Sequence, residues 1–162
     1  MDRGRTLAIA ALKGAVSGLA GVAVMTLVEE AELAVTKRPR SAVPARTLLA
    51  LLGGHPGDGP QPPLWNHAMH WGTGFVVGAL RGVWAVTGIR GWSANLHHAA
   101  VRLAFDQTLE NATGVGAPPT TWPPREVAID LTQKTIYSIA TGVVADRWIV
   151  PVLRSQRGRT SH

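Results

Sequence analysis

Cysteine is absent from the chain of 162 residues, and aromatic residues make up only 6% of it. Without cysteine, the protein forms no disulfide and offers no thiolate metal ligand, iron–sulfur cluster or cysteine nucleophile. Charged residues are also scarce, at 16%, against about 25% in typical soluble domains. Glycine, in contrast, occurs 18 times, and hydrophobic residues make up 46%. This combination favours a small membrane protein, and the length predicts a single membrane domain, residues 1–162.

Motifs for nucleotide and nucleic-acid binding are missing as well. The stretch GTGFVVG, residues 72–78, lacks the glycine spacing of a dinucleotide-binding loop and follows no predicted strand. The net charge of +6 comes mostly from basic residues at the termini and in loops beside apolar segments, as in inner-membrane proteins. We therefore expect the lipid bilayer as a partner and no nucleic acid.

Four long helices are predicted, because apolar segments separate at glycine- and proline-rich breaks. They cover about residues 5–36, 64–86, 92–113 and 124–153, and a short interfacial helix covers about residues 44–52. In the first segment the apolar character extends over 22 residues, from Leu7 to Val28. This is the length of a membrane span rather than of a cleaved signal peptide, so we expect the segment to be retained.

Small and charged residues together favour a membrane bundle over a soluble one. Glycines recur at helix-packing intervals on the first two long segments, at Gly14, Gly18, Gly21, Gly74, Gly78 and Gly82. An interior glycine costs a soluble helix about 1 kcal/mol relative to alanine, whereas in lipid it lets helices approach closely. Ionisable residues interrupt the later segments, at Arg81, Arg102, Asp106, Asp130, Lys134 and Asp146. A bundle would hide them in its interior, so the expected fold is an all-α integral membrane four-helix bundle; a soluble basic helical bundle is the alternative.

The two halves of the chain also resemble each other weakly. Residues 70–84 align with residues 134–148, which pairs Gly78 with Gly142 and Trp84 with Trp148. If the similarity reflects duplication, the bundle consists of two related helical hairpins. Basic residues are more numerous on the side that carries both termini, so we expect both termini in the cytoplasm.

Helix rise places ionisable side chains from all four long helices at one end of the bundle. At 1.5 Å per residue, Glu29 lies about 33 Å along the first helix from Leu7, at the far edge of the hydrocarbon core. The second helix begins at that end, the third ends there and the fourth begins there. The candidate site residues in this layer are Glu29, Glu30, His67, His70, Asp106 and Asp130.

Three interpretations of this layer stay open. The six residues could ligate a divalent transition metal, although the Glu-x-x-His motif of di-iron bundles is absent. Ionisable residues at membrane depth also mark ion or proton pathways. Alternatively, the charges only neutralise one another: Glu29 or Glu30 would pair with Lys134 or an arginine, and Asp106 would pair with Arg102.

Four stretches of the chain resemble a known family: GLAGVAVMTLVEEAE, VPAR, HWGTGFVVGALRGVW and IYSIATGVVADRW. They are similar to the YagU family of small bacterial inner-membrane proteins of unknown function. The resemblance implies a multi-pass helical protein of the bacterial inner membrane, with acid-stress tolerance as an association, and it brings no catalytic residues. We expect a non-enzymatic role, either as a structural or accessory subunit that forms a homo-oligomer or binds a membrane-protein partner, or as an ion- or proton-handling module. A metal-binding membrane protein or metal-dependent membrane enzyme is the alternative.

Overall fold

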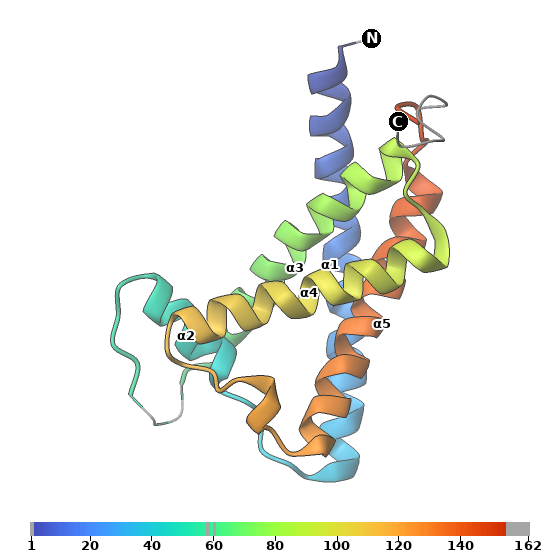
Figure 1. Cartoon of the computed structure of the whole chain (residues 1–162). Coiled ribbons are helices and arrows are strands. Elements are labelled where there is room, and N and C mark those ends of the chain that lie inside the picture. The colour runs from blue at the N-terminus through green and yellow to red at the C-terminus, as the bar shows by residue number, and fades with distance from the viewer. Residues whose placement is uncertain (1, 58, 60, 155–162) are drawn as a thin grey trace.

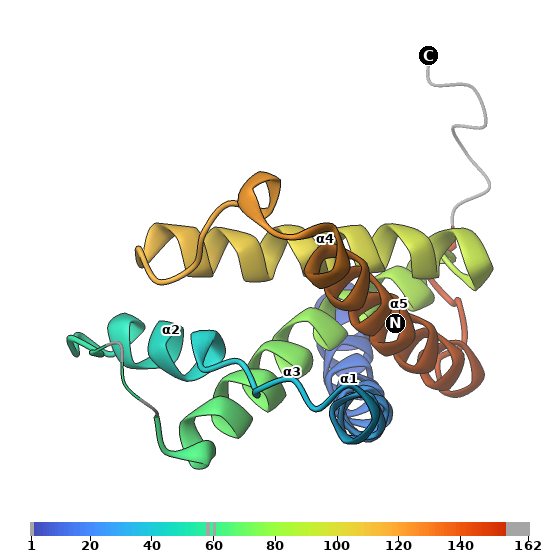
Figure 2. The ribbon, with the colours of Figure 1, turned by 90° about the horizontal axis from the view of Figure 1, so that it is seen from below.

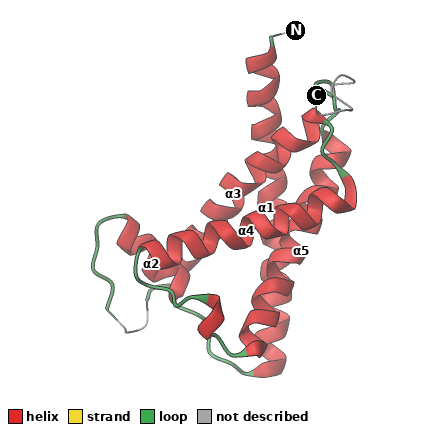
Figure 3. Cartoon of the chain, in the orientation of Figure 1, coloured by secondary structure: helices red, strands yellow, loops and turns green. Residues whose placement is uncertain are grey.

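Helices are the only regular secondary structure in the described part of the chain, which comprises residues 2–57, 59 and 61–154 of a computed structural model (Figure 3). The elements are α1 (Arg3–Thr36), α2 (Val43–Leu51), α3 (Pro63–Thr87), α4 (Gly91–Ala112), the 3-10 turn η1 (Pro119–Thr121) and α5 (Pro124–Trp148). The predicted all-α fold class is therefore confirmed over these residues.

The helix ends follow from the local sequence. The carboxylate of Asp2 accepts a hydrogen bond of 3.0 Å from the backbone N–H of Gly4, which caps the start of α1. The sequence predicts that the last helix continues to about residue 153, but α5 ends at Trp148. That prediction was wrong because Pro151 has no N–H to donate and its ring disfavours a helical conformation at Val150.

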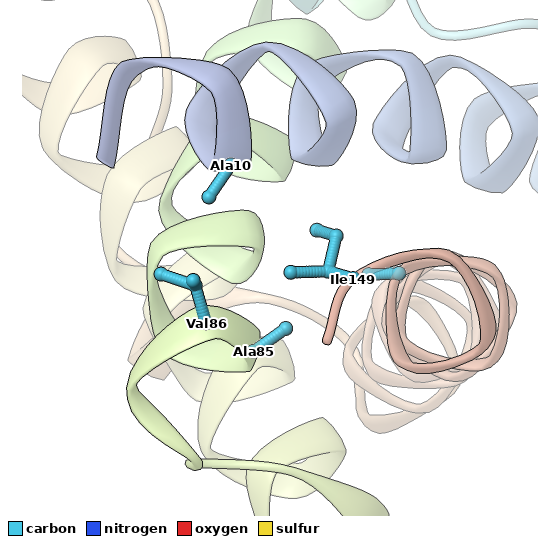
Figure 4. Close-up of a cluster of buried hydrophobic side chains, with 5 residues drawn as sticks. Ala10, Ala85, Val86 and Ile149 are labelled. Atoms are coloured by element: carbon cyan, nitrogen blue, oxygen red, sulfur yellow. The ribbon is translucent and has the colours of Figure 1, made fainter. Parts of the chain in front are cut away.

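The four long helices cross one another instead of running parallel. α1 packs along both α3 and α5, α4 packs on α5, and the short α2 packs on α3. Figure 1 shows α4 crossing α1 and α5 obliquely, and the view from below in Figure 2 places α4 on the opposite side of the molecule from α1. The start of α1 meets the ends of α3 and α5 in a small apolar cluster, shown in Figure 4, whose members are Ala10, Ala85, Val86, Ala145 and Ile149.

Glycine allows α1 and α3 to touch backbone to backbone. A Cβ atom added at Gly78 of α3 would lie 2.6 Å from the Cα of Gly18 and 2.7 Å from the carbonyl oxygen of Gly14, both on α1. No residue with a side chain fits there without separating the helices, since ordinary carbon contacts are about 3.5–4.0 Å. The crossing holds both helices in the register that brings the end of α1 beside the start of α3.

Charged side chains lie in the interior beside apolar ones, and many large apolar side chains are exposed. Arg81 and Arg102 are 0% and 1% exposed and are the two largest fully buried side chains among the described residues. Large apolar side chains are exposed on the outer faces of all four long helices, among them Leu12, Leu27, Phe75, Val76, Leu96 and Leu131. Fully buried arginines are uncommon in soluble proteins, because a charge loses its hydration on burial and needs a partner there.

One helix in the described part of the chain, α1 with 34 residues, is long and apolar enough to cross a membrane by length and composition. A buried core helix or a signal sequence near the N-terminus meets the same criterion. The helical bundle of the prediction is therefore confirmed for the described residues, whereas its placement in a membrane stays a prediction.

Candidate functional site

A pocket of about 450 Å³ lies where α1 and α4 end and α3 and α5 begin. Its ionisable lining comes from all four long helices and the loop after α1: Glu29, Arg38, His70, Arg102, Asp106, Glu110, Glu126, Asp130 and Lys134. Apolar side chains complete the wall, including Met69, Trp122 and Ile129. A cavity of this size and mixed lining is typical of sites for small ligands.

Four of the six residues predicted as metal ligands line this pocket, namely Glu29, His70, Asp106 and Asp130. The other two, Glu30 and His67, lie outside its lining, and both are exposed. The pocket also contains Glu110, Glu126 and Lys134, which the predicted set omits. Glu126, Asp130 and Lys134 are spaced four residues apart and so lie on one helix face. This spacing could have predicted Glu126 and Lys134 as site residues together with Asp130.

At the rim, the two glutamates of α1 share one arginine from the loop that follows. Arg40 contacts the carboxylate of Glu30 at 2.5 Å and that of Glu29 at 3.7 Å. The hydrogen bond to Glu30 raises the pKa of Arg40, so the guanidinium keeps its charge. The other oxygen of Glu29 lies 4.0 Å from Nε2 of His70. Glu29 therefore faces both an arginine and a pocket histidine.

In the pocket wall, two aspartates and two cations form one buried network. Nε of Arg102 donates to Asp106 Oδ2 at 2.9 Å, and the ammonium of Lys134 lies 3.5 Å from the same oxygen. Lys134 also donates to Asp130, one helical turn earlier on α5. Because two positive charges meet two negative charges, this network is neutral as a whole.

Arg102 connects this network to the middle of the molecule. Its Nη2 donates to the hydroxyl of Thr73 at 2.7 Å, and its guanidinium lies 4.8 Å from the ring centroid of Tyr137. The Tyr137 ring in turn stacks on His98 at 5.5 Å between centroids, and its hydroxyl donates to the Gly74 carbonyl at 2.7 Å. Such contacts hold the guanidinium in place and compensate for its removal from water.

Two pocket carboxylates have no basic partner in the part of the chain that the structure describes. Glu110 accepts a hydrogen bond of 3.3 Å from Gln107, an uncharged side chain. The carboxylate of Glu126, in the first turn of α5, has no hydrogen bond or ion pair within the described residues. Five carboxylates and three basic side chains line the pocket, the three being Arg38, Arg102 and Lys134, so the formal charge of the lining is negative.

A metal centre is not preformed here. Across residues 2–57, 59 and 61–154, no three or more histidine, aspartate and glutamate side chains lie close enough together to hold a metal ion. Glu29 and His70 are a pair of possible ligands, with 4.0 Å between a carboxylate oxygen and Nε2. The metal site stays a prediction.

A second polar cluster, which the sequence did not predict, lies at the opposite end of the helices. Nη2 of Arg81 donates to Asn95 at 3.1 Å and to Asp146 at 2.8 Å. Asp146 also accepts from the backbone N–H of Gly91 at 2.9 Å and lies 3.5 Å from Nε of Arg90. Arg81 is the sequence feature that could have indicated this cluster, since a charge inside an apolar segment needs a buried counter-charge. These contacts join α3, α4 and α5 and close that end.

Comparison with protein-family models, with curated proteins and with solved structures returned no match for this chain. The resemblance to the YagU family therefore stays a prediction.

Proposed function

We propose that the protein is a multi-pass helical protein of the bacterial inner membrane that handles cations, protons included, through the pocket at one membrane face. The observation that carries this proposal is that charged side chains are buried while large apolar side chains are exposed on all four long helices, with a carboxylate-rich pocket at one end. In a bilayer, exposed apolar faces are solvated by lipid and charged groups are found inside the bundle.

Helix length and hydroxyl bonding agree with this environment. The long helices have 34, 25, 22 and 25 residues, and about 20 suffice to cross a bilayer core. On the outer faces, the hydroxyls of Thr108, Thr132 and Thr135 each donate to the carbonyl four residues earlier in the same helix, at 2.6–2.7 Å. These hydroxyls are therefore satisfied without water, as lipid requires.

The charge of the pocket indicates the sign of the solute. Negatively charged clefts concentrate cations and repel anions. The neutral network of Arg102, Asp106, Lys134 and Asp130 leaves Glu110 and Glu126 to give the pocket its excess charge. A cation or a proton is thus the solute that the pocket favours.

Membrane placement can be tested by cysteine scanning, because the chain has no cysteine of its own. Val76 on the outer face of α3 is 54% exposed and Ile89 in the α3–α4 turn is 51% exposed, so their accessibility to solvent differs only if lipid covers one of them. In intact cells we expect a water-soluble maleimide to label Ser41→Cys, to label Ile89→Cys only after permeabilisation, and to leave Val76→Cys unlabelled. Equal labelling of Val76→Cys and Ile89→Cys after permeabilisation would contradict the membrane proposal.

Cation handling can be tested with purified protein in liposomes. We expect uptake of radiolabelled methylammonium, or acidification measured with an entrapped pH dye, to exceed that of empty liposomes. The double variant Glu110→Gln/Glu126→Gln should reduce uptake, whereas Glu30→Gln, outside the pocket lining, should not. If methylammonium uptake and acidification both equal those of empty liposomes, the proposal is refuted.

Metal binding is the second candidate function, and the proximity of Glu29 and His70 favours it. Metal analysis of protein purified in detergent tests this alternative. A stoichiometric transition metal that is lost in His70→Ala would support it over simple cation handling.

A further inference from the structure

Lys134 occupies an unusual position for a lysine. It is 9% exposed, it lies in the pocket wall, and its ammonium contacts a carboxylate on α5 and another on α4. Burying an ammonium costs several kcal/mol unless nearby groups compensate. Here Asp106 and Asp130 supply that compensation, and they would do the same for another small cation of the ammonium type.

The same pocket offers the lysine a second place to bind. Glu110 lies within electrostatic range of Lys134, and Glu126 lies two turns before it on α5. Neither carboxylate has a basic partner among the described residues. Because lysine carries one charge on a flexible four-carbon stem, it can exchange carboxylate partners without a change in the backbone.

We propose that Asp106 and Asp130 form an ammonium-type cation site which the side chain of Lys134 fills at rest, so that an external cation binds by displacing Lys134 toward Glu110 and Glu126. This inference rests on the proposed cation handling at the same pocket and names its binding residues and its internal competitor. The lysine acts as a tethered cation, and a tether of this length holds its charge at an effective concentration in the millimolar range or above. An external cation therefore binds more weakly than it would to the two aspartates alone.

The test is equilibrium binding of radiolabelled methylammonium to the whole chain in detergent, at constant ionic strength set with N-methylglucamine chloride. Lys134→Met removes the competing charge and keeps a side chain of similar length. We expect it to bind one methylammonium per chain at least about tenfold more tightly than the wild type, because the tethered competitor is gone. Lys37→Met, on the exposed loop after α1, is the matched control and should bind as the wild type does.

A further variant locates the site. Lys134→Met/Asp130→Asn lacks one of the two carboxylates, and we expect it to lose the gain in affinity. If the double variant binds methylammonium as tightly as Lys134→Met, the site is elsewhere and the inference is overturned. Lys134→Gln replaces Lys134→Met if the latter does not fold.

The wild-type protein gives an independent measurement. The chain has only two other lysines, Lys13 and Lys37, so acylation of each can be followed by peptide mass spectrometry. We expect methylammonium to raise the acylation rate of Lys134 relative to that of Lys37, and N-methylglucamine to leave the ratio unchanged. The ratio cancels the consumption of reagent by methylammonium itself.

The outcomes separate this inference from the function on which it rests. Equal methylammonium affinity in the wild type and in Lys134→Met, with an unchanged acylation ratio, overturns displacement of Lys134 but leaves cation binding at the pocket intact. Absence of methylammonium binding from the wild type and from every variant overturns both. Tighter binding to Lys134→Met without uptake into liposomes retains the site and refutes only the handling of cations across the membrane.

Discussion

Replacing Gly78 with alanine tests whether the glycine crossing holds the molecule together. The added Cβ atom would lie 2.6 Å from the Cα of Gly18 and 2.7 Å from the carbonyl oxygen of Gly14. Both neighbours are backbone atoms of α1, so neither can rotate away as a side chain would. Relief requires that α1 and α3 move apart by about 1 Å, which weakens contacts along the whole crossing.

The expected loss of stability can be estimated from two opposing effects. Overpacking of a rigid interior costs about 1–3 kcal/mol, and the upper end applies because only backbone can yield. Alanine returns up to about 1 kcal/mol of intrinsic helix preference. We therefore expect Gly78→Ala to lower the free energy of unfolding by about 2 kcal/mol, which corresponds to a fall in Tm of roughly 4–8 °C for a protein of this size.

The matched control lies on the same helix. A Cβ atom added at Gly72 meets nothing within 4 Å, so Gly72→Ala gains helix preference without an overpacking cost. Thermal unfolding in detergent, followed by circular dichroism, should place Gly72→Ala at or above the wild type and Gly78→Ala below it. A Gly78→Ala variant as stable as Gly72→Ala would show that the two helices do not depend on this close contact.

Three further predictions concern buried polar groups. Asp106→Asn removes the carboxylate that Arg102 contacts and leaves Lys134 with Asp130 alone, which should cost about 3–5 kcal/mol, measured as a lowered Tm; unchanged stability would contradict a buried ion network. Asp146→Asn should loosen the turn between α3 and α4, because Asp146 holds Arg81 at 2.8 Å, and hydrogen exchange in that turn should then accelerate. Tyr137→Phe loses the hydrogen bond of 2.7 Å to the Gly74 carbonyl and should cost about 1 kcal/mol in the same unfolding assay, with more than about 3 kcal/mol indicating a wider role for the hydroxyl.

Local signals in the sequence were sufficient for the helices but not for the pairing of charges. Apolar runs, prolines and glycines gave helix positions that match the structure closely except where Pro151 ends α5 early. Helix rise brought Glu29 and Asp106 to the same end of the molecule, and both line the pocket. The partner of Glu30 is Arg40, ten residues later in an irregular loop, and no helical periodicity predicts such a contact.

Ion pairs between distant helices were even harder to predict from the sequence. Arg81 and Asp146 are 65 residues apart, and their contact depends on how far α3 and α5 slide along each other. That offset is set by packing, such as the glycine crossing of α1 and α3, and cannot be predicted from the sequence of either helix alone. The sequence therefore indicated that each buried charge needs a partner without indicating which partner it has.

The direction of one polar stripe distinguishes a membrane bundle from a soluble one more sharply than average hydropathy does. On α4 the residues Asn95, His98, Arg102 and Asp106 recur every three or four positions, and in the sequence such a stripe could face either water or a bundle interior. All four are buried, while Leu96 on the same helix is 50% exposed. Averages over a helix count both faces equally, so the inward charges of α3, α4 and α5 lower the mean hydropathy of helices whose outer faces are apolar. Within the residues that the structure describes, α1 is the one helix that satisfies a length-and-composition criterion for a membrane span. A soluble bundle would turn this stripe outward to hydrate it, whereas lipid contacts only the outer face; the inward direction of the stripe on α4 is thus the strongest support for the membrane proposal.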